Sequence, residues 1–450
     1  MHLVIIGNGI TGTTVARHVR KLKDWKITMI SSESEHFYSR TALMYIYMGH
    51  MKYKHTKPYE DWFWKKNKID LVFDHVDEIN TEQKKLFLKK GEPIHYDKLV
   101  LATGSKPNKF GWPGQDLDGV QGMYSLQDLE LMEKYSDDTE RAVIVGGGLI
   151  GIEAAEMFHS RNIPVTFLIR EKNYWSNVLP EDEAKLVNRE VYSNHIDLRR
   201  ETSLKEILPD ENGRVRAIVT DKDEEIACQI VMLTAGVSPN VDLVRDSEIE
   251  TNRGVLVNHR LETNIEDVYA AGDCAEFTDA AAGDPVIEPL WYTGKMQGQA
   301  LAKVLAGSDE KYERGIWFNS AKFFDIEYHT YGRVPANLPE DQETFYWEHA
   351  NGRKCLRINF NKEDRSITGV NSFAMRLRHI VFERWIAEGK SLEYVLENFG
   401  EAMFDPEFEG KHHQEILDFY NQHSTGSEKL KIKRKKGLFS LLQFRRTAKA

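Results

Sequence analysis

The chain has 450 residues, with 70 acidic and 60 basic side chains and a formal charge of −10. This length allows roughly three domains, and the acidic balance argues against nucleic acid as a partner. No apolar run is long enough to span a bilayer. The first expected strand starts at residue 3, which leaves no room for a signal peptide. We therefore expect a cytoplasmic protein.

The cysteines and histidines indicate neither disulfide nor metal chemistry. The three cysteines, Cys228, Cys274 and Cys355, lie far apart and form no CxxC pair. The sixteen histidines show no spacing typical of metal ligands. The sequence therefore predicts no metal site and no iron–sulfur cluster.

A glycine-rich turn follows the first expected strand. The apolar residues from Leu3 to Ile6 indicate a buried strand, and a helix is expected over 13–23. Between them, Gly7, Gly9 and Gly12 fit the pattern GxGxxG. In this pattern the first glycine allows a tight turn, the second lets a pyrophosphate approach the backbone, and the third lets the helix pack closely. The stretch predicts a dinucleotide-binding cradle.

Two side chains after this cradle are candidate ligand contacts. A second strand is expected over 26–31, and Glu33 is the nearest acid to the place where dinucleotide folds hold the adenosine ribose. A solvated turn glutamate is the alternative. Arg40 offers a guanidinium that can clamp a phosphate, with a simple surface arginine as the alternative.

A further strand ends close to the expected ligand. Strands are expected over 71–76, 84–88 and 96–101, and the last of them closes on Ala102, Thr103 and Gly104. Such a small-residue ending lets the chain pass near a ligand. The Pro and Gly residues from 107 to 119 then indicate a crossing between domains.

The pattern of strand, glycine turn and helix recurs in the middle of the chain. Gly146, Gly148 and Gly151 follow a β-branched run and precede a helix over 152–159. A strand over 164–169 and a helix over 180–193 come next, and a later strand ends near Gly236. Two cradles predict two dinucleotides, although ordinary glycine-rich turns in α/β units are the alternative.

The choice between NADH and NADPH depends on two neighbouring residues. Arg170 suits a 2′-phosphate, whereas Glu171 suits a free 2′-hydroxyl. We expect NADH, because an acid so close repels the phosphate. Farther along, a short strand runs into Gly272 and Asp273, where the aspartate can reach a sugar-alcohol hydroxyl.

The last part of the chain changes character. Alternating stretches near 316–318, 326–331, 344–347 and 355–360 indicate antiparallel strands, with Asn351 and Gly352 as a hairpin turn. Helices are expected over 375–388 and 392–399.

The order of these motifs resembles the FAD-dependent pyridine nucleotide-disulfide oxidoreductase superfamily over roughly residues 1–400. The resemblance implies that the first cradle binds the ADP part of FAD and the second binds NAD(P)H. It also implies that Asp273 meets the ribityl chain, that Val76 lies by the adenine, and that Arg40, Thr103 and Gly104 line the FAD site. Glu153 is then the catalytic candidate, facing nicotinamide and flavin; an acid favourably placed at a helix N-terminus is the alternative.

One departure from the superfamily narrows the activity that we expect. Disulfide reductases carry a redox cysteine where this chain has residues 38–45, which include none. The chain is more similar to the single-flavin relatives: ferredoxin, rubredoxin and putidaredoxin reductases, the flavin part of nitrite reductases, and apoptosis-inducing factor. Several of these carry a lysine, paired with the glutamate, where Tyr45 stands here.

The expected fold is α/β, with two Rossmann-like dinucleotide-binding domains, one inserted in the other, and an α+β C-terminal domain. The expected boundaries are 1–115 and 246–308 for the FAD domain, 116–245 for the NAD(P)H domain, 309–425 for the C-terminal domain, and 426–450 for a basic tail.

The expected activity is that of an FAD-dependent NAD(P)H oxidoreductase that passes electrons to a separate acceptor such as a ferredoxin or rubredoxin. A peripheral-membrane NADH:quinone reductase and a flavin-bound redox sensor or assembly factor are the alternatives. The tail bears on this choice, since residues 429–450 hold nine Lys or Arg and no acid. It suits attachment at the inner face of a membrane, docking of an acidic carrier, or a solvated tail.

Overall fold

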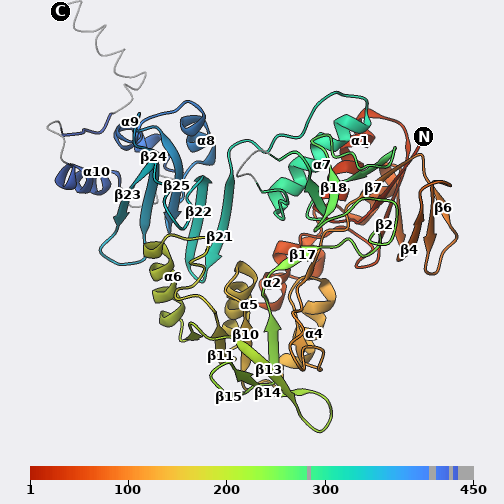
Figure 1. Ribbon diagram of the computed structural model, residues 1–450, viewed down its shortest axis with the longest axis horizontal. Coiled ribbons are helices and arrows are strands. Elements are labelled where there is room, and N and C mark those ends of the chain that lie inside the picture. The colour runs from red at the N-terminus through yellow and green to blue at the C-terminus, as the bar shows by residue number, and fades with distance from the viewer. Residues whose placement is uncertain (281–284, 405–411, 425–428, 434–450) are drawn as a thin grey trace, which may run out of the picture. The chain divides into compact units, whose positions relative to one another are not determined.

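The computed structural model describes residues 1–280, 285–404, 412–424 and 429–433 (Figure 1). The chain packs as two compact units. The first unit comprises residues 1–170 and 196–314, and the second comprises residues 171–195 and 315–450.

The first unit contains a five-stranded parallel sheet built around the start of the chain. Its strand order is β19-β7-β1-β2-β3. Helix α1 (Ile10–Leu22) follows the first strand and packs against α7 (Trp291–Leu305). The strands are β1 (His2–Ile6), β2 (Lys26–Ser31), β3 (Ile69–Phe73), β7 (Lys98–Leu101) and β19 (Val268–Ala270).

A second five-stranded parallel sheet lies in the same unit, with the order β12-β11-β10-β16-β9. Helix α5 (Leu149–Ser160) follows β10 at the second glycine turn. The strands are β9 (Val120–Gln121), β10 (Ala142–Val145), β11 (Val165–Leu168), β12 (Asp197–Arg199) and β16 (Ile230–Leu233). All of them come between β7 and β19 of the first sheet, so one Rossmann-like fold is inserted in the other, and the predicted fold class is confirmed.

Smaller elements complete the first unit. They are the helices α2 (Leu43–Tyr47), α3 (Asp61–Lys66) and α4 (Leu126–Ser136), the 3-10 turns η1 (Arg40–Ala42) and η2 (Tyr53–Thr56), and the strands β4 (Val76–Asn80), β5 (Lys85–Leu88), β6 (Ile94–His95), β8 (Ser105–Pro107), β13 (Leu204–Pro209), β14 (Val215–Thr220), β15 (Glu225–Ala227), β17 (Val237–Pro239), β18 (Val255–Val257) and β20 (Ala275–Phe277).

The strand predicted over 71–76 is divided between β3 and β4. Asp74 causes the break, because its carboxylate accepts hydrogen bonds from the backbone N–H groups of His75 at 2.8 Å and Gly91 at 2.8 Å. A short polar side chain that binds nearby backbone in this way competes with the ladder of a strand.

The second unit is built on an antiparallel sheet of order β21-β22-β25-β24-β23. Figure 1 shows this sheet with the helices that accompany it, and α8 contacts β22 and β25. The elements are β21 (Phe318–Phe323), β22 (Ile326–Gly332), β23 (Gln342–Glu348), β24 (Cys355–Asn361), β25 (Ile367–Phe373), α6 (Glu181–Ser193), α8 (His379–Ala387), α9 (Leu392–Asn398), η3 (Phe399–Glu401) and α10 (His412–His423).

Two features of the second unit differ in detail from the prediction. Residues 375–377 are not helical as expected, because the backbone of Leu377 pairs with Met403 before α8 begins. Helix α6, which the predicted boundaries give to the nucleotide domain, packs in this unit. Its Glu183 is fully buried and pairs with Arg357 of β24, with Nε to Oε1 at 2.6 Å. The predicted domain boundaries stay a prediction.

The first residues of the basic tail are fixed on the second unit. Leu430 and Ile432 pack against its core. The backbone N–H of Leu430 donates to Asn421 Oδ1 at 2.8 Å, and Lys433 pairs with Glu397 at 2.5 Å. Of the predicted segment 426–450, only 429–433 belong to the described residues. Within the described parts of the chain, no helix is both long and apolar enough to cross a membrane.

Candidate functional site

A cavity of about 650 Å³ opens beside the carboxyl ends of the first sheet's strands. Ligands of open α/β sheets bind at this edge, and a volume of this order suits a small-molecule ligand. The predicted site residues that line the cavity are Gly7, Gly9, Glu33, Arg40, Val76, Ala102, Thr103, Gly104 and Asp273.

The first glycine turn has the geometry of a phosphate cradle. Gly7 has φ +111°, and a Cβ there would lie 2.0 Å from Ala102 O. A Cβ on Gly12 would lie 2.0 Å from Gly7 O, whereas one on Gly9 would meet nothing within 4 Å. The outer glycines are therefore required by packing, and the central one leaves open space above the helix N-terminus, where an anion is favoured.

The second glycine turn repeats this division of roles. A Cβ on Gly146 would lie 2.7 Å from Thr234 O, and one on Gly151 would lie 2.5 Å from Gly146 O. A Cβ on Gly148 would lie 3.8 Å from Thr234 O, an ordinary contact. In both turns, therefore, packing excludes a side chain at the two outer glycines and leaves space for one at the central glycine.

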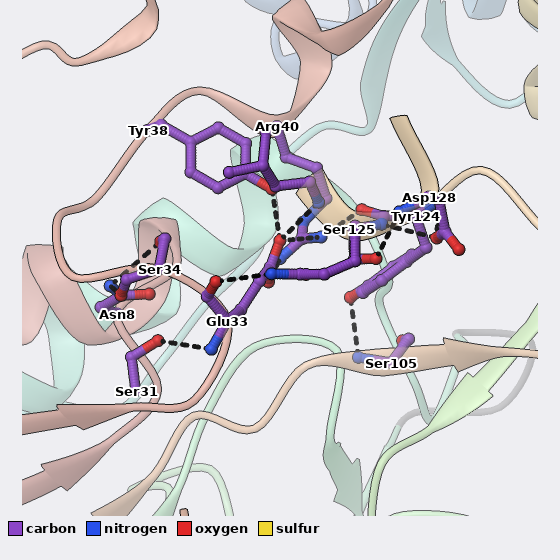
Figure 2. A network of polar contacts seen from close by, with 12 residues as sticks. Asn8, Ser31, Glu33, Ser34, Tyr38, Arg40, Ser105, Tyr124, Ser125 and Asp128 are labelled. Carbon is purple, nitrogen blue, oxygen red and sulfur yellow. Dashed lines mark hydrogen bonds and ion pairs between the residues drawn. The ribbon is translucent and has the colours of Figure 1, made fainter. Parts of the chain in front are cut away.

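Glu33 and Arg40 face each other in the cavity wall (Figure 2). Arg40 donates through both terminal nitrogens to the Glu33 carboxylate, at 3.1 and 2.6 Å. Glu33 also accepts from the hydroxyl of Tyr38 and, at 3.1 Å, from the backbone N–H of Leu126 in the first turn of α4. Glu33, the acid predicted to hold the adenosine ribose, thus already accepts hydrogen bonds from a cation, a phenol and a helix N-terminus.

Tyr124 joins this network to the rest of the cavity. The guanidinium carbon of Arg40 lies 4.2 Å from the Tyr124 ring centroid, and Arg40 also donates to the Tyr124 carbonyl. The Tyr124 hydroxyl accepts from the backbone N–H of Ser105 at 2.9 Å (Figure 2). Burial lowers the pKa of Arg40, but the nearby Glu33 carboxylate raises it by more, so the pKa lies above its ordinary value. Arg40 therefore stays charged.

Asp273 lies in the same cavity, and a series of buried hydrogen bonds holds the turn that carries it. Burial raises its pKa, although Ser105 Oγ donates to its carboxylate at 3.2 Å. The preceding Gly272 donates its backbone N–H to the buried Gln297 at 2.6 Å. Gln297 in turn donates to Glu288 at 3.3 Å, and Tyr312 donates to the same carboxylate at 2.6 Å. This buried chain fixes the turn that presents Asp273.

Glu153 lies on α5, outside the residues that line the cavity. Its half-buried side chain has a pKa raised to about 7, mainly by burial and further by Glu156. At neutral pH this carboxyl is therefore divided between its charged and neutral forms.

The free energy of unfolding should report this shift. Because the folded protein binds the Glu153 proton more tightly than the unfolded chain, stability should fall as pH rises from about 4.5 towards about 7. The variant Glu153→Gln should be more stable than the wild type at pH 8, by about 3 kcal/mol, and equally stable at low pH. Denaturant titrations across this pH range measure the difference. A constant offset at every pH would contradict the assignment.

Other predicted residues lie away from the cavity lining. They are Gly12, Gly272, Gly146, Gly148, Gly151, Glu153, Arg170, Glu171 and Gly236. Gly12 and Gly272 pack next to it, since a Cβ on Gly272 would lie 2.5 Å from Thr11 Oγ1. The sequence analysis assigned no role to Ser105 or Tyr124. No local pattern marks Tyr124, because its contact with Arg40 joins residues 84 positions apart.

A second group of polar side chains lies on the second unit. His349, His412 and Glu415 place one potential ligand atom each within 4.8 Å of one another. Lys354 Nζ lies 3.2 Å from His412 Nε2, and the backbone N–H of Asn351 donates to His349 Nδ1 at 3.1 Å. These donors favour protons on the ring nitrogens nearest Glu415. We therefore interpret the group as a hydrogen-bonded cluster and assign no metal to it.

The three cysteines are buried and free. Of the described residues that line the cavity, none is a cysteine. Burial raises the pKa of Cys274 and raises that of Cys228 to about 12, so both remain thiols at neutral pH.

Comparison with known proteins decides the family. The model of the pyridine nucleotide-disulphide oxidoreductase family matches residues 1–298. The chain belongs to this family. It is 32% identical to the rubredoxin-NAD(+) reductase of Acinetobacter baylyi, over 68% of this chain and 79% of that protein. Its structure resembles NADH:rubredoxin oxidoreductase from Clostridium acetobutylicum, with a TM-score of 0.69, 25% identity, and 88% and 98% of the two chains covered.

Other relatives are much longer than this chain. The assimilatory nitrate reductase electron transfer subunit of Bacillus subtilis is 27% identical over 76% of this chain, which covers 43% of that protein. The nitrite reductase [NAD(P)H] of the same organism is covered to 40%. The chain thus spans about two fifths of these two relatives. Membership of the family confirms the predicted cofactors, FAD and NAD(P)H.

Proposed function

We propose that the chain is an FAD-dependent NAD(P)H oxidoreductase that passes electrons to a separate acceptor such as a ferredoxin or rubredoxin. The observation that carries this proposal is the presence of two open glycine cradles, one of which borders a cavity with the half-buried carboxylate of Asp273 and no cysteine among its lining residues. Relatives named for rubredoxin support the choice of acceptor.

The residues present fit FAD. The open space above Gly9 and the N-terminus of α1 accommodate a pyrophosphate. Arg40 supplies a permanent cation for the phosphates, and Asp273 accepts hydrogen bonds from the ribityl hydroxyls. Val76 lies at the adenine end. Tyr38, Arg40 and Leu126 donate to Oε1 of Glu33, whereas Arg40 alone donates to Oε2, so Oε2 keeps a lone pair that can accept from a ribose hydroxyl.

The second cradle holds the pyridine nucleotide in this proposal. Gly146, Gly148 and Gly151 form the turn, the N-terminus of α5 receives the pyrophosphate, and Arg170 and Glu171 flank the adenosine ribose, with Gly236 closing the strand opposite. When bound, FAD supplies the hydride acceptor, and the electrons leave it for the acceptor. The chain contributes binding and orientation, while Glu153 holds a proton that exchanges near neutral pH.

A quinone at a membrane surface is the second candidate acceptor. It is favoured by one observation: residues 429–433, which belong to the basic stretch 429–450 with its nine Lys or Arg and no acid, are anchored on α9 and α10. The third alternative, a flavin-bound redox sensor or assembly factor, would turn over with none of these acceptors.

Anaerobic titration with NADH followed by an acceptor panel tests these proposals. The purified protein should carry one FAD, take up two electrons, and reduce a ferredoxin or rubredoxin faster than a quinone presented in anionic vesicles. A colourless protein that takes up no FAD would overturn the flavin assignment. Flavin reduction at least about tenfold more efficient with NADPH would overturn the choice of NADH.

The vesicle arm of the panel compares the full chain with one that ends at Ser427. Loss of vesicle binding and of quinone reduction in the shorter chain would favour the membrane-bound alternative. Equal sedimentation of the two chains would exclude a membrane role for the tail.

A further inference from the structure

The turn that carries Asp273 is completed by a side chain from a distant helix. Ala271 still belongs to the sheet, since its backbone N–H donates to Leu101 O of β7 at 3.0 Å. The next N–H, that of Gly272, lies beyond this pairing and donates instead to Gln297 Oε1 at 2.6 Å. Gln297 of α7 therefore fixes the backbone immediately before Asp273.

The Gln297 amide is part of a buried network with Glu288, Tyr312 and Arg314. Gln297 is fully buried, and its Nε2 donates to Glu288 Oε2 at 3.3 Å. The Tyr312 hydroxyl donates to the same oxygen at 2.6 Å, and Arg314 Nη1 lies 3.3 Å from Glu288 Oε1. None of these four side chains belongs to the cavity lining. Because a buried polar group is costly unless it is paired, each member of the network holds its neighbour in one orientation.

Gln297 is mounted on a helix that packs directly on the first cradle. A Cβ on Gly294 of α7 would lie 2.7 Å from Thr11 Oγ1, and one on Gly298 would lie 2.9 Å from Thr11 O. Helix α7 therefore approaches the backbone of α1 in the turn that follows the cradle. Through Gln297, the Asp273 turn is held at a fixed position relative to this cradle.

The same network reaches a second part of the cavity wall. Glu288 directly precedes Pro289, Leu290 and Trp291, which line the cavity. The Glu288 backbone carbonyl also accepts from Thr293 Oγ1 at 2.8 Å, in the first turn of α7. The hydrogen bond between Gln297 and Glu288 thus connects two stretches of the wall that are far apart in the sequence.

We propose that Gln297 is a positioning residue for the flavin, which strengthens FAD binding by holding Asp273 where its carboxylate accepts from the ribityl hydroxyls. The proposal rests on the proposed function, which assigns Asp273 to the ribityl chain. Hydrogen bonds weaken steeply with distance and angle, so a small shift of the Gly272 backbone is enough to weaken those of Asp273. The competing explanation is that Gln297 only stabilises the fold.

Gln297→Met removes both hydrogen bonds of the amide while nearly keeping the length of the side chain. It should weaken FAD binding by about tenfold, the effect of one misplaced hydrogen bond. Flavin fluorescence on dilution of the FAD-loaded protein measures the dissociation constant. The control is Gln229→Met, which removes a half-buried amide that accepts from the backbone of Glu140 and Arg141 at 3.0 and 3.1 Å, outside the cavity lining. The control should bind FAD as the wild type does.

A double-variant cycle separates positioning from general stability. If Gln297 acts through Asp273, then Gln297→Met added to Asp273→Ala should weaken FAD binding by less than about twofold further. If the two losses multiply, Gln297 acts independently of Asp273 and the inference is wrong.

Gln297→Glu provides a variant that is rescued by protons. The introduced acid is buried beside Glu288, which raises its pKa. When protonated, its O–H can donate to Glu288 and its carbonyl can accept from Gly272, as the amide does. Tyr312 remains a phenol, because burial and Glu288 raise its pKa, and Arg314 remains a cation. FAD affinity relative to the wild type should therefore be close to normal near about pH 5.5 and fall as the pH rises and the acid loses its proton. Binding as weak as that of Gln297→Met at the lowest pH would contradict the inference.

The outcomes distinguish failure of the inference from failure of the proposed function. If the wild type takes up no FAD, the flavin assignment is wrong. If Asp273→Ala binds FAD as tightly as the wild type, the assignment of Asp273 is wrong. If Asp273→Ala loses affinity but Gln297→Met does not, only the positioning role of Gln297 is wrong.

Discussion

Gly9→Trp is expected to give a colourless protein, and Gly148→Trp a yellow protein whose flavin a pyridine nucleotide no longer reduces. A side chain fits sterically at both positions, since a Cβ meets nothing within 4 Å at Gly9 and only Thr234 O, at 3.8 Å, at Gly148. Each indole should therefore occupy the space of one pyrophosphate and leave the fold intact. Flavin absorbance and stopped-flow reduction by NADH measure the two effects.

The same substitution in the two cradles makes each variant the control for the other. Gly148→Trp should slow flavin reduction by at least about 100-fold, because the nucleotide cannot take its reactive position, while one FAD per chain is retained. Gly9→Ala and Gly148→Ala should weaken binding of the same cofactors far less than the tryptophan variants, because a methyl group only partly blocks the approach of a pyrophosphate. Equal loss of flavin in both tryptophan variants would refute the assignment of one cradle to each cofactor.

The cradles were predictable from sequence because their requirements are local. Gly7 must adopt a positive φ beside Ala102, and Gly12 must let a helix pass within contact of the turn, so both positions exclude a side chain. A strand, a turn and a helix in immediate succession carry this information within a few residues. The local pattern also placed Asp273 at a strand end, whereas its contact with the ribityl chain came from the family resemblance and stays a prediction.

The hydrogen-bond network around Glu33 could not be predicted, because it depends on contacts between residues that are far apart in the sequence. Arg40 and Glu33 are close in sequence, but Tyr124 and Leu126 reach them from α4 and its N-terminal turn. The ribose prediction treated Glu33 as a lone acid at a strand end. Its carboxylate instead ties the first sheet's loop to the start of α4, a contact that only the folded chain creates.

Helix α6 shows the same limit for domain boundaries. Its amphipathic pattern predicts a helix, and α6 is present, but pattern alone does not say which core it covers. The ion pair between the buried Glu183 and Arg357 holds α6 in the second unit, and these two residues lie 174 positions apart in the chain.

Arg357→Met should destabilise the second unit by about 3–5 kcal/mol, because it leaves a buried carboxylate without its cation. Glu183 is 0% exposed, Arg357 donates to it at 2.6 and 2.9 Å, and Asn371 lies 3.5 Å away. Burial raises the pKa of Glu183 even though Arg357 lowers it. Without Arg357 this pKa should rise further, so the variant's deficit should be largest above the new pKa and shrink as pH falls through it. Calorimetric unfolding at several pH values measures this dependence.

Two further variants test whether the buried pair is the cause. Arg365→Met removes a more exposed arginine, whose side chain is 38% exposed and pairs with Glu393, and should cost only about 0–1 kcal/mol. Adding Glu183→Gln to Arg357→Met should recover part of the lost stability, since the uncompensated charge is gone. If the double variant is no more stable than Arg357→Met at neutral pH, the loss comes from packing of the arginine side chain and not from the stranded carboxylate.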